Sequence, residues 1–422
     1  MPGISCYVML KFSFGTEPAM RCVVGKVALI VAIALVVVIG SGLARDEDEW
    51  QRIAGAHAFN LVQWEYENLL DKWRYKAMCA LNGDCISSIE YRDLVSRYLE
   101  LEQRIFGLEA EIDRGGTSGS GNTALEAELA SLKSETGRLR PVVEEVIESQ
   151  ISSVLAGLGL SFRIRLGGDF DLVFPPVDIA FSQRPNVLII SLRERIELVN
   201  TVLLKPDVLP EDRISMEEQV DGLGFSGLAT TIGGVATYPS IVPRAVSLET
   251  LLSTAAHEWV HQYLAFHPLG RNYWTSYEMR VINETVADIA GDELGRLVYS
   301  LFYDGEDLAG AGELPGNGFD FRKAMREIRL AVDDYLASGE IELAELFMEE
   351  QRLYLAENGY YIRKLNQAFF AFHGAYGESP ASVSPVGEQL RKLREQSSDF
   401  REFVTSVSGI SSYDDLLKIV GE

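Results

Sequence analysis

Positive charge is scarce in this sequence. Its 422 residues include 38 lysines and arginines against 62 aspartates and glutamates, which gives a formal net charge of −24. Because phosphate groups are bound by clustered Lys and Arg side chains, this balance argues against a nucleic acid or an anionic lipid surface as a partner. Hydrophobic residues make up 47% of the chain, as in ordinary globular proteins. The length then predicts roughly two to three structural units.

Cysteine is also rare, and the four cysteines fall into two groups. Cys6 and Cys22 precede a long apolar run, whereas Cys79 and Cys85 follow it in the stretch CALNGDC. The Asn-Gly-Asp between Cys79 and Cys85 favours a turn, so these two could close a small disulfide loop in an oxidising compartment. A zinc site is the alternative, but the sequence has no other cysteine or histidine close to this pair.

One hydrophobic segment near the N-terminus has the length of a short membrane span. Residues 23–44 contain the uninterrupted apolar run Val27–Ile39. Basic residues precede this run and the acidic stretch RDEDE follows it, so residues 1–22 are expected in the cytoplasm and the later residues outside. The span is predicted to be a single-pass anchor in the cell membrane. A signal peptide cut after Ala44 is the alternative, and it would give a secreted protein.

Residues 45–158 are expected to be mainly helical. Apolar residues recur at steps of three and four on both sides of the Gly/Ser-rich stretch Gly115–Asn122, which is the seam pattern of a coiled coil. Two seams joined by a flexible loop predict an antiparallel helical hairpin. We expect a spacer or packing arm, with recruitment of a protein partner as a second role. The seam residues are Leu94, Tyr98, Leu101, Ile105, Leu108 and Ile112, and then Leu125, Leu129, Leu132, Thr136, Leu139 and Val143.

Residues 159–422 are predicted to form one α+β domain. Strand patterns come first, at Phe162–Leu166, Val177–Phe181 and Asn186–Ser191. The stretch Val235–Val242 is expected to be an edge strand, because its proline cannot donate to a ladder on both sides. Helical patterns follow from Ser247 to the C-terminus, and strands followed by helices are typical of the α+β class.

Two of the five histidines stand four residues apart in the stretch TAAHEWVHQYL. Ser247 as an N-cap and the Pro-Leu-Gly sequence farther on predict a helix over Leu248–Phe266. On this helix His257 and His261 project from one face, one turn apart, and can share a tetrahedral cation. Glu258 then stands beside the ion, where a general base can take a proton from water.

The pattern His-Glu-x-x-His arises by chance in a chain this poor in histidine with a probability on the order of 1 in 100 or less. A zinc hydrolase also needs a third protein ligand. The sequence Thr275–Glu278 matches a capping box, and a second helix is predicted over Tyr277–Phe302. Glu284 on this helix is placed to be that ligand. Asp288, one turn later, can accept a hydrogen bond from the far ring nitrogen of His257, and the small residue Gly291 permits close helix packing.

The sequence HEWVH followed by NETVAD resembles the gluzincins, the thermolysin-like division of zinc metallopeptidases. The resemblance implies that His257, His261 and Glu284 bind Zn²⁺, that Glu258 is the general base and that Asp288 orients a ligand. It also implies a zincin-like fold, in which a cleft separates a β-rich N-terminal lobe from a helical C-terminal lobe. An edge strand lines that cleft, and the stretch GGVATYPS could fill this role by pairing with an extended peptide.

The same resemblance implies that a histidine of the C-terminal lobe and a tyrosine near the ligand helices stabilise the oxyanion. His373 and either Tyr273 or Tyr277 are the candidates by position, although His373 could equally be a core histidine. His57 and His267 are expected to be structural. Two features depart from the family pattern: 22 residues separate the second histidine from the glutamate ligand, and the Gly-x-Met-Glu-Asn element of a large aminopeptidase family is absent.

These patterns predict a membrane-tethered zinc metallopeptidase that hydrolyses peptide or protein substrates. The sequence has no obvious group to capture a free amine, so an endopeptidase is favoured over an aminopeptidase. The alternative hypothesis is a non-catalytic extracytoplasmic scaffold or adhesion protein with a zincin-like core, which the long heptad arms and the acidic surface would suit. The complete set of ligand and base residues argues for the enzyme.

Overall fold

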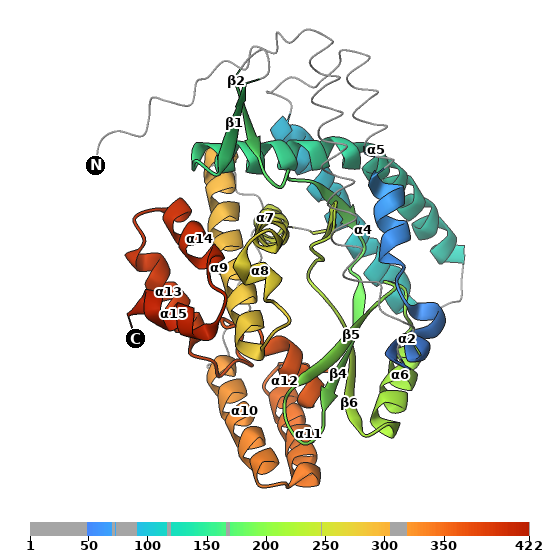
Figure 1. The fold of residues 1–422 in the computed structure, drawn as a ribbon. Helices are drawn as coiled ribbons and strands as arrows, with labels where there is room; N and C mark the ends of the chain where they lie inside the picture. Colours follow the sequence, from blue (N-terminus) through green and yellow to red (C-terminus); the bar gives the residue numbers. More distant parts are fainter. Residues whose placement is uncertain are drawn as a thin grey trace.

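The structure is a computed structural model that describes residues 49–69, 72, 91–115, 120–165, 169–245, 247–303 and 319–421. It contains both helices and strands, in agreement with the α+β prediction (Figure 1). Among the described helices, none is both long and apolar enough to cross a lipid bilayer. The predicted span over residues 23–44 and the predicted Cys79–Cys85 pair lie outside the described residues.

Among the described elements, helices come first, seven strands follow with one helix between the fifth and the sixth, and only helices come after the last strand. The strands are β1 (Ser161–Arg165), β2 (Asp169–Val173), β3 (Ile179–Ser182), β4 (Asn186–Leu192), β5 (Leu198–Leu204), β6 (Phe225–Thr231) and β7 (Ser240–Pro243). The helices are α2 (Glu49–Ala54), η1 (Gly55–His57), α4 (Tyr91–Gly115), α5 (Ser120–Gly157), α6 (Pro210–Gly222), α7 (Leu248–Ala265), α8 (Pro268–Arg271), α9 (Tyr277–Phe302), α10 (Phe321–Ala337), α11 (Ile341–Glu357), α12 (Gln367–His373), α13 (Val386–Gln396), α14 (Phe400–Ser408) and α15 (Tyr413–Val420).

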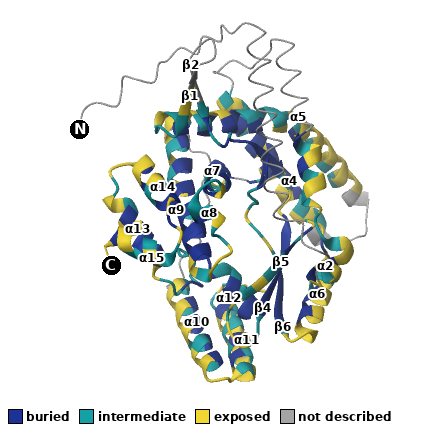
Figure 2. Cartoon of the chain, in the orientation of Figure 1, coloured by how far each residue is buried: buried dark blue, intermediate teal, exposed yellow. Residues whose placement is uncertain are grey.

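The largest described sheet is antiparallel and has the order β5–β4–β6. Its central strand β4 is the predicted stretch Asn186–Ser191, extended by one residue. Side chains of β4 alternate between two apolar clusters: Leu188 packs with residues of α2 and α6, whereas Val187 packs with residues of α12. The continuous apolar run of β4 therefore reflects burial on both faces of the sheet (Figure 2).

The predicted edge strand Val235–Val242 is shorter in the structure. Only β7 is a strand, and it pairs in parallel with β3, which covers the second half of the predicted stretch Val177–Phe181. Before β7 the chain turns through Pro239, and Val235 exchanges backbone hydrogen bonds with Ile241. Proline cannot donate to a strand ladder, so the strand does not continue before Pro239. The backbone groups of Val235 are instead hydrogen-bonded within the segment, to Ile241.

The two predicted coiled-coil helices, α4 and α5, lie side by side and antiparallel. Ion pairs connect Arg97 with Glu135 at 3.1 Å and Arg104 with Glu128 at 2.8 Å, so later residues of α4 meet earlier residues of α5. The second half of α5 enters the main hydrophobic core together with α7 and α9, so one core extends across residue 158. This hairpin packs on the body of the protein.

Carboxylates of α5 also complete the hydrogen bonding of β3. Glu148 accepts a hydrogen bond from the backbone N–H of Ile179 at 3.0 Å, and Glu144 accepts one from Phe181 at 2.8 Å. Both glutamates are buried. Since an edge strand leaves its N–H groups unpaired, these carboxylates protect the edge of β3 that faces away from β7.

Helices α7 and α9 form the centre of the main core (Figures 1 and 2). Ser247 caps α7 as predicted, whereas α9 is capped by Ser276 rather than by the first residue of the predicted box Thr275–Glu278. The helices approach closely at Gly291, where an ideal Cβ would lie 2.8 Å from the backbone N of His257. This contact confirms the predicted role of Gly291 in helix packing.

The remaining helices surround this pair. Helices α10, α11 and α12 build a separate apolar cluster, and α13, α14 and α15 add their apolar residues to the main core. In Figure 1, α10 and α11 form a projecting pair at the bottom of the view. The loop after α12 returns to α9, where the backbone N–H of Gly377 donates to Oγ1 of Thr285 at 3.0 Å.

Candidate metal centre

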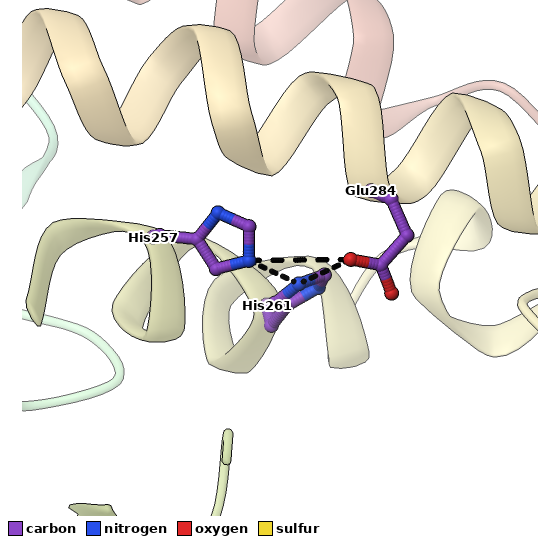
Figure 3. Close-up of side chains that lie close together, drawn as sticks. All are labelled: His257, His261 and Glu284. Carbon is purple, nitrogen blue, oxygen red and sulfur yellow. Dashed lines mark hydrogen bonds and ion pairs between the residues drawn. The ribbon is translucent and has the colours of Figure 1, made fainter. Parts of the chain in front are cut away.

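Three predicted ligand side chains converge between α7 and α9 (Figure 3). The Nε2 atoms of His257 and His261 are 3.0 Å apart. Oε2 of Glu284 lies 3.4 Å from Nε2 of His261 and 4.0 Å from Nε2 of His257. The helical spacing of four residues places both rings on one face of α7, and the close packing of α9 brings the carboxylate opposite them.

Hydrogen bonds at the far side of each ring fix the direction of the lone pairs. Nδ1 of His257 lies 3.1 Å from Oδ1 of Asp288, as predicted, and Nδ1 of His261 lies 2.8 Å from Oδ1 of Asn283. A carboxylate oxygen and an amide oxygen only accept, so each ring carries a proton on Nδ1. The two Nε2 atoms are then the atoms that face the common centre.

The triangle of donor atoms fits a divalent cation. Ligand bonds of about 2 Å in tetrahedral geometry put neighbouring donor atoms about 3.3 Å apart, close to the two shorter sides of this triangle. Oε2 of Glu284 is buried without a hydrogen-bond partner in the described part of the chain. A cation at the centre would satisfy this oxygen and both nitrogens. The side chains of His257 and His261 are 18% and 15% exposed, so neither ring is completely closed off from solvent.

The electrostatic environment is strongly acidic. Burial disfavours the charged form of His257, but the hydrogen bond to Asp288 and the charges of Glu258 and Glu284 outweigh it and raise its pKa to about 9. Burial raises the pKa of Glu284, but the imidazoles and the Tyr273 hydroxyl lower it to about 2. The site therefore attracts positive charge, and Glu284 is ionised at neutral pH.

Glu258 lies next to the donor triangle without belonging to it. Its side chain is buried, and burial raises its pKa, although the two imidazoles act in the opposite direction. Its Oε1 lies against Gly234, where an added Cβ would overlap the carboxylate. The segment before β7 thus packs against Glu258 at Gly234, where the missing side chain leaves the space that the carboxylate occupies.

The two candidate tyrosines have different partners. The Tyr273 hydroxyl donates to Oε1 of Glu284, so Tyr273 orients the carboxylate whose other oxygen faces the imidazoles. The Tyr277 hydroxyl donates to the carbonyl of Gly374 at 3.0 Å. Tyr273 therefore contacts the ligand set directly, whereas Tyr277 joins α9 to the end of α12.

The C-terminal histidine is packed among aromatic rings. The ring of His373 is tilted against Phe369 and edge-on to Phe372, at centroid distances of 4.4 and 5.3 Å, and burial lowers its pKa to about 4. It is thus neutral at pH 7, and its described ring contacts are those of a core residue. His267 is expected to be structural, and its Nδ1 donates to the backbone carbonyl of Tyr263 on α7 at 2.8 Å, because a carbonyl oxygen can only accept.

Tyr376 is a residue of this site that the sequence did not single out. Burial raises the pKa of its hydroxyl well above the usual range, and the charges of Glu284, Glu258 and Asp288 raise it further. The hydroxyl therefore lies within electrostatic reach of all three carboxylates. The hydrogen bond from the following residue to Thr285 holds Tyr376 beside α9. No local sequence pattern predicts that Tyr376 lies near Glu284, because 91 residues separate them.

No protein-family model, no curated protein and no solved structure matches this chain. Only the side chains of the site itself therefore indicate what chemistry it can perform. They comprise three converging donor atoms, an adjacent buried carboxylate and two phenol groups near the carboxylate ligand. This set can bind a divalent cation, move a proton and donate a hydrogen bond to a developing negative charge.

Proposed function

We propose that the protein is a zinc-dependent metallopeptidase that resembles the gluzincins, and that it cleaves peptide bonds within extended chains. The observation that carries this proposal is the convergence of His257, His261 and Glu284 with a separate buried carboxylate, Glu258, beside them. Two imidazoles and one carboxylate with an open position are the usual protein ligands of hydrolytic zinc. A structural zinc site would instead be closed by a fourth protein ligand.

A zinc ion bound there would supply Lewis-acid activation of water and of a substrate carbonyl. Glu258 would accept a proton from the attacking water and deliver it to the leaving amine, which is the work of a general base and then a general acid. Its raised pKa suits both directions of this transfer. The hydroxyl of Tyr376 would donate a hydrogen bond to the oxygen that becomes negative in the transition state.

The proposal includes the surroundings of the site. Gly234 lies against Glu258, and the exposed and half-buried residues Gly233–Ala236 around it would contact the backbone of an extended substrate. Nothing in the ligand set captures a free amine, which favours cleavage within a chain over removal of N-terminal residues. The apolar run over residues 23–44 would tether the enzyme to the membrane with the site outside the cytoplasm.

Hydrolysis of a quenched-fluorescence peptide library, with and without a chelator, tests the proposal. The purified protein is expected to cleave peptides, to lose activity with the chelator and to regain it with zinc.

Glu258→Gln should keep one zinc per chain and lose turnover by at least about 1000-fold, because the base is removed while the ligands stay. Glu278→Gln, an exposed acid on the same helix as Glu284, is the matched control and should be fully active. Undiminished hydrolysis by Glu258→Gln would contradict the assignment.

A further inference from the structure

One buried positive charge beside the metal centre has no described counter-ion. Arg280 is 9% exposed, and its Nε atom has no hydrogen-bond partner among the described residues. The guanidinium lies over the ring of Tyr277, with Cζ 5.8 Å from the ring centroid. Burying a charge is costly unless an opposite charge or hydrogen bonds compensate for it, so this guanidinium is poised to bind an anion.

A second buried arginine lies near the hydrogen-bond partner of the same tyrosine. Arg329 is 6% exposed, and its Nε donates to Asp333 at 2.8 Å, but its Nη1 has no partner in the described chain. This Nη1 lies against Gly374, whose carbonyl accepts the hydrogen bond of the Tyr277 hydroxyl. The charges around Tyr277 are these two buried guanidinium groups, Asp333 and the exposed Glu278. Because Glu278 is exposed to solvent, the unpartnered nitrogen atoms of the two arginines are left to a buried anion.

The position of Arg280 connects this charge with the metal centre. Arg280 precedes Glu284 by one helical turn, so both side chains lie on one face of α9. Tyr273, whose hydroxyl donates to Glu284, is within electrostatic range of Arg280. Four residues of helix rise by about 6 Å, and an extended peptide advances by about 3.3 to 3.6 Å per residue. A substrate group bound by Arg280 would therefore lie about two residues from the bond that is cleaved.

We propose that Arg280, supported by Arg329, binds a carboxylate of the peptide substrate near the scissile bond. This inference rests on the proposed peptidase function. Guanidinium groups match carboxylates in shape and charge and can form two parallel hydrogen bonds with them. The carboxylate can come from an acidic side chain or from a free C-terminus, and both present the same two oxygens. The site thus selects negatively charged peptides, although the protein itself is acidic.

Calorimetric binding of matched peptides to zinc-loaded Glu258→Gln protein, which does not turn them over, tests the proposal. One pair differs by Glu against Gln two residues from the bond, and a second pair by a free against an amidated C-terminus. The carboxylate form of at least one pair is expected to bind about 10- to 100-fold more tightly, the range of a charged hydrogen bond. The pair that shows the difference identifies the source of the carboxylate.

Substitution of the arginine then assigns the effect. Adding Arg280→Gln is expected to abolish the preference and leave the neutral peptides unaffected, whereas Arg280→Lys should restore part of it. Arg296→Gln, exposed on the same helix, is the matched control and should keep the full preference. Equal binding of both members in both pairs by the parent protein would overturn the proposal, and so would a preference that survives Arg280→Gln. An Arg280-dependent preference in a protein that cleaves no peptide would refute the peptidase function and leave the carboxylate site standing.

Discussion

Oδ1 of Asn283 lies 2.8 Å from Nδ1 of His261, so the residue next to the carboxylate ligand orients the opposite imidazole. Asn283 is buried and its amide oxygen can only accept, which holds the ring proton on Nδ1 and frees Nε2. Asn283→Leu, which removes the acceptor at similar volume, is expected to lower zinc affinity by about 10- to 100-fold. Competition with a fluorescent chelator measures this affinity. Asp292→Asn, exposed on the same helix, should bind zinc like the unmodified protein; a matching loss there would remove Asn283 from this role.

Gly234→Ala is expected to disable the base while leaving the metal in place. The new Cβ would overlap Oε1 of Glu258 and lie 2.9 Å from the carbonyl of Ile241, so the carboxylate must move. A displacement of about 1 Å costs about 100-fold in turnover. The neighbouring Gly233 has open space where a Cβ would go, so Gly233→Ala should remain active with the same zinc content. If the two variants show the same kcat, Gly234 does not position the carboxylate.

Gly291→Ala should weaken the packing of α9 on α7. Its Cβ would lie 2.8 Å from the Cα and backbone N of His257, and neither atom can move without shifting the helix. We expect a loss of about 1 to 3 kcal/mol in the free energy of unfolding, the usual cost of overpacking, together with weaker zinc binding. Urea denaturation measures the first effect. Gly137→Ala meets nothing within 4 Å on α5 and should raise stability by about 0.5 to 1 kcal/mol; a loss of the same size there would exclude overpacking as the cause.

The stability of the fold should fall between weakly acidic and neutral pH because of Glu65. Glu65 is fully buried in the helical stretch 61–69, accepts a hydrogen bond from the backbone N–H of Tyr238, and has its pKa raised by burial to about 7. An acid whose pKa is higher in the folded state adds stability below its unfolded pKa, 4.5, and loses it as pH rises through about 7.

Glu65→Gln should flatten this dependence. Between the two pKa values the contribution of one such group changes the folding constant by about tenfold per pH unit. Urea denaturation at pH 5, 6, 7 and 8 would measure it, with Glu67→Gln on the same helical stretch as the exposed control. The control should retain the slope of the parent protein. A parent protein that gains stability relative to Glu65→Gln as pH rises would show that Glu65 is ionised when folded.

Local sequence signals predicted the ligand helices well. The spacing of His257 and His261 follows from the helical repeat, and Ser247 supplies the start of α7. Both signals act within one element, so they do not depend on tertiary contacts. The same reasoning located Glu284 and Asp288 on α9, because both lie on the face that includes Gly291. The predicted helix Tyr277–Phe302 has the bounds of α9, but its cap is Ser276 rather than Thr275, because Ser and Thr stand side by side and either can cap a helix.

The contacts between elements could not be predicted in this way. Asn283 precedes Glu284 by one residue and points about 100° away from it around the helix, so its contact with His261 depends on how α7 and α9 cross. Tyr376 and Gly234 reach the site through loops from distant parts of the chain. The turn at Pro239 shortened the predicted edge strand, since the backbone of Val235 pairs with Ile241 within the same segment.

The position of the metal is the most direct test of the site. Crystals of the zinc-loaded protein, measured at wavelengths on either side of the zinc absorption edge, would locate the ion by anomalous diffraction. We predict a single peak about 2.0 to 2.2 Å from Nε2 of His257, Nε2 of His261 and an oxygen of Glu284, with a solvent molecule as the fourth ligand. A peak at other residues, or no peak between α7 and α9 at full zinc loading, would contradict the proposed metal centre.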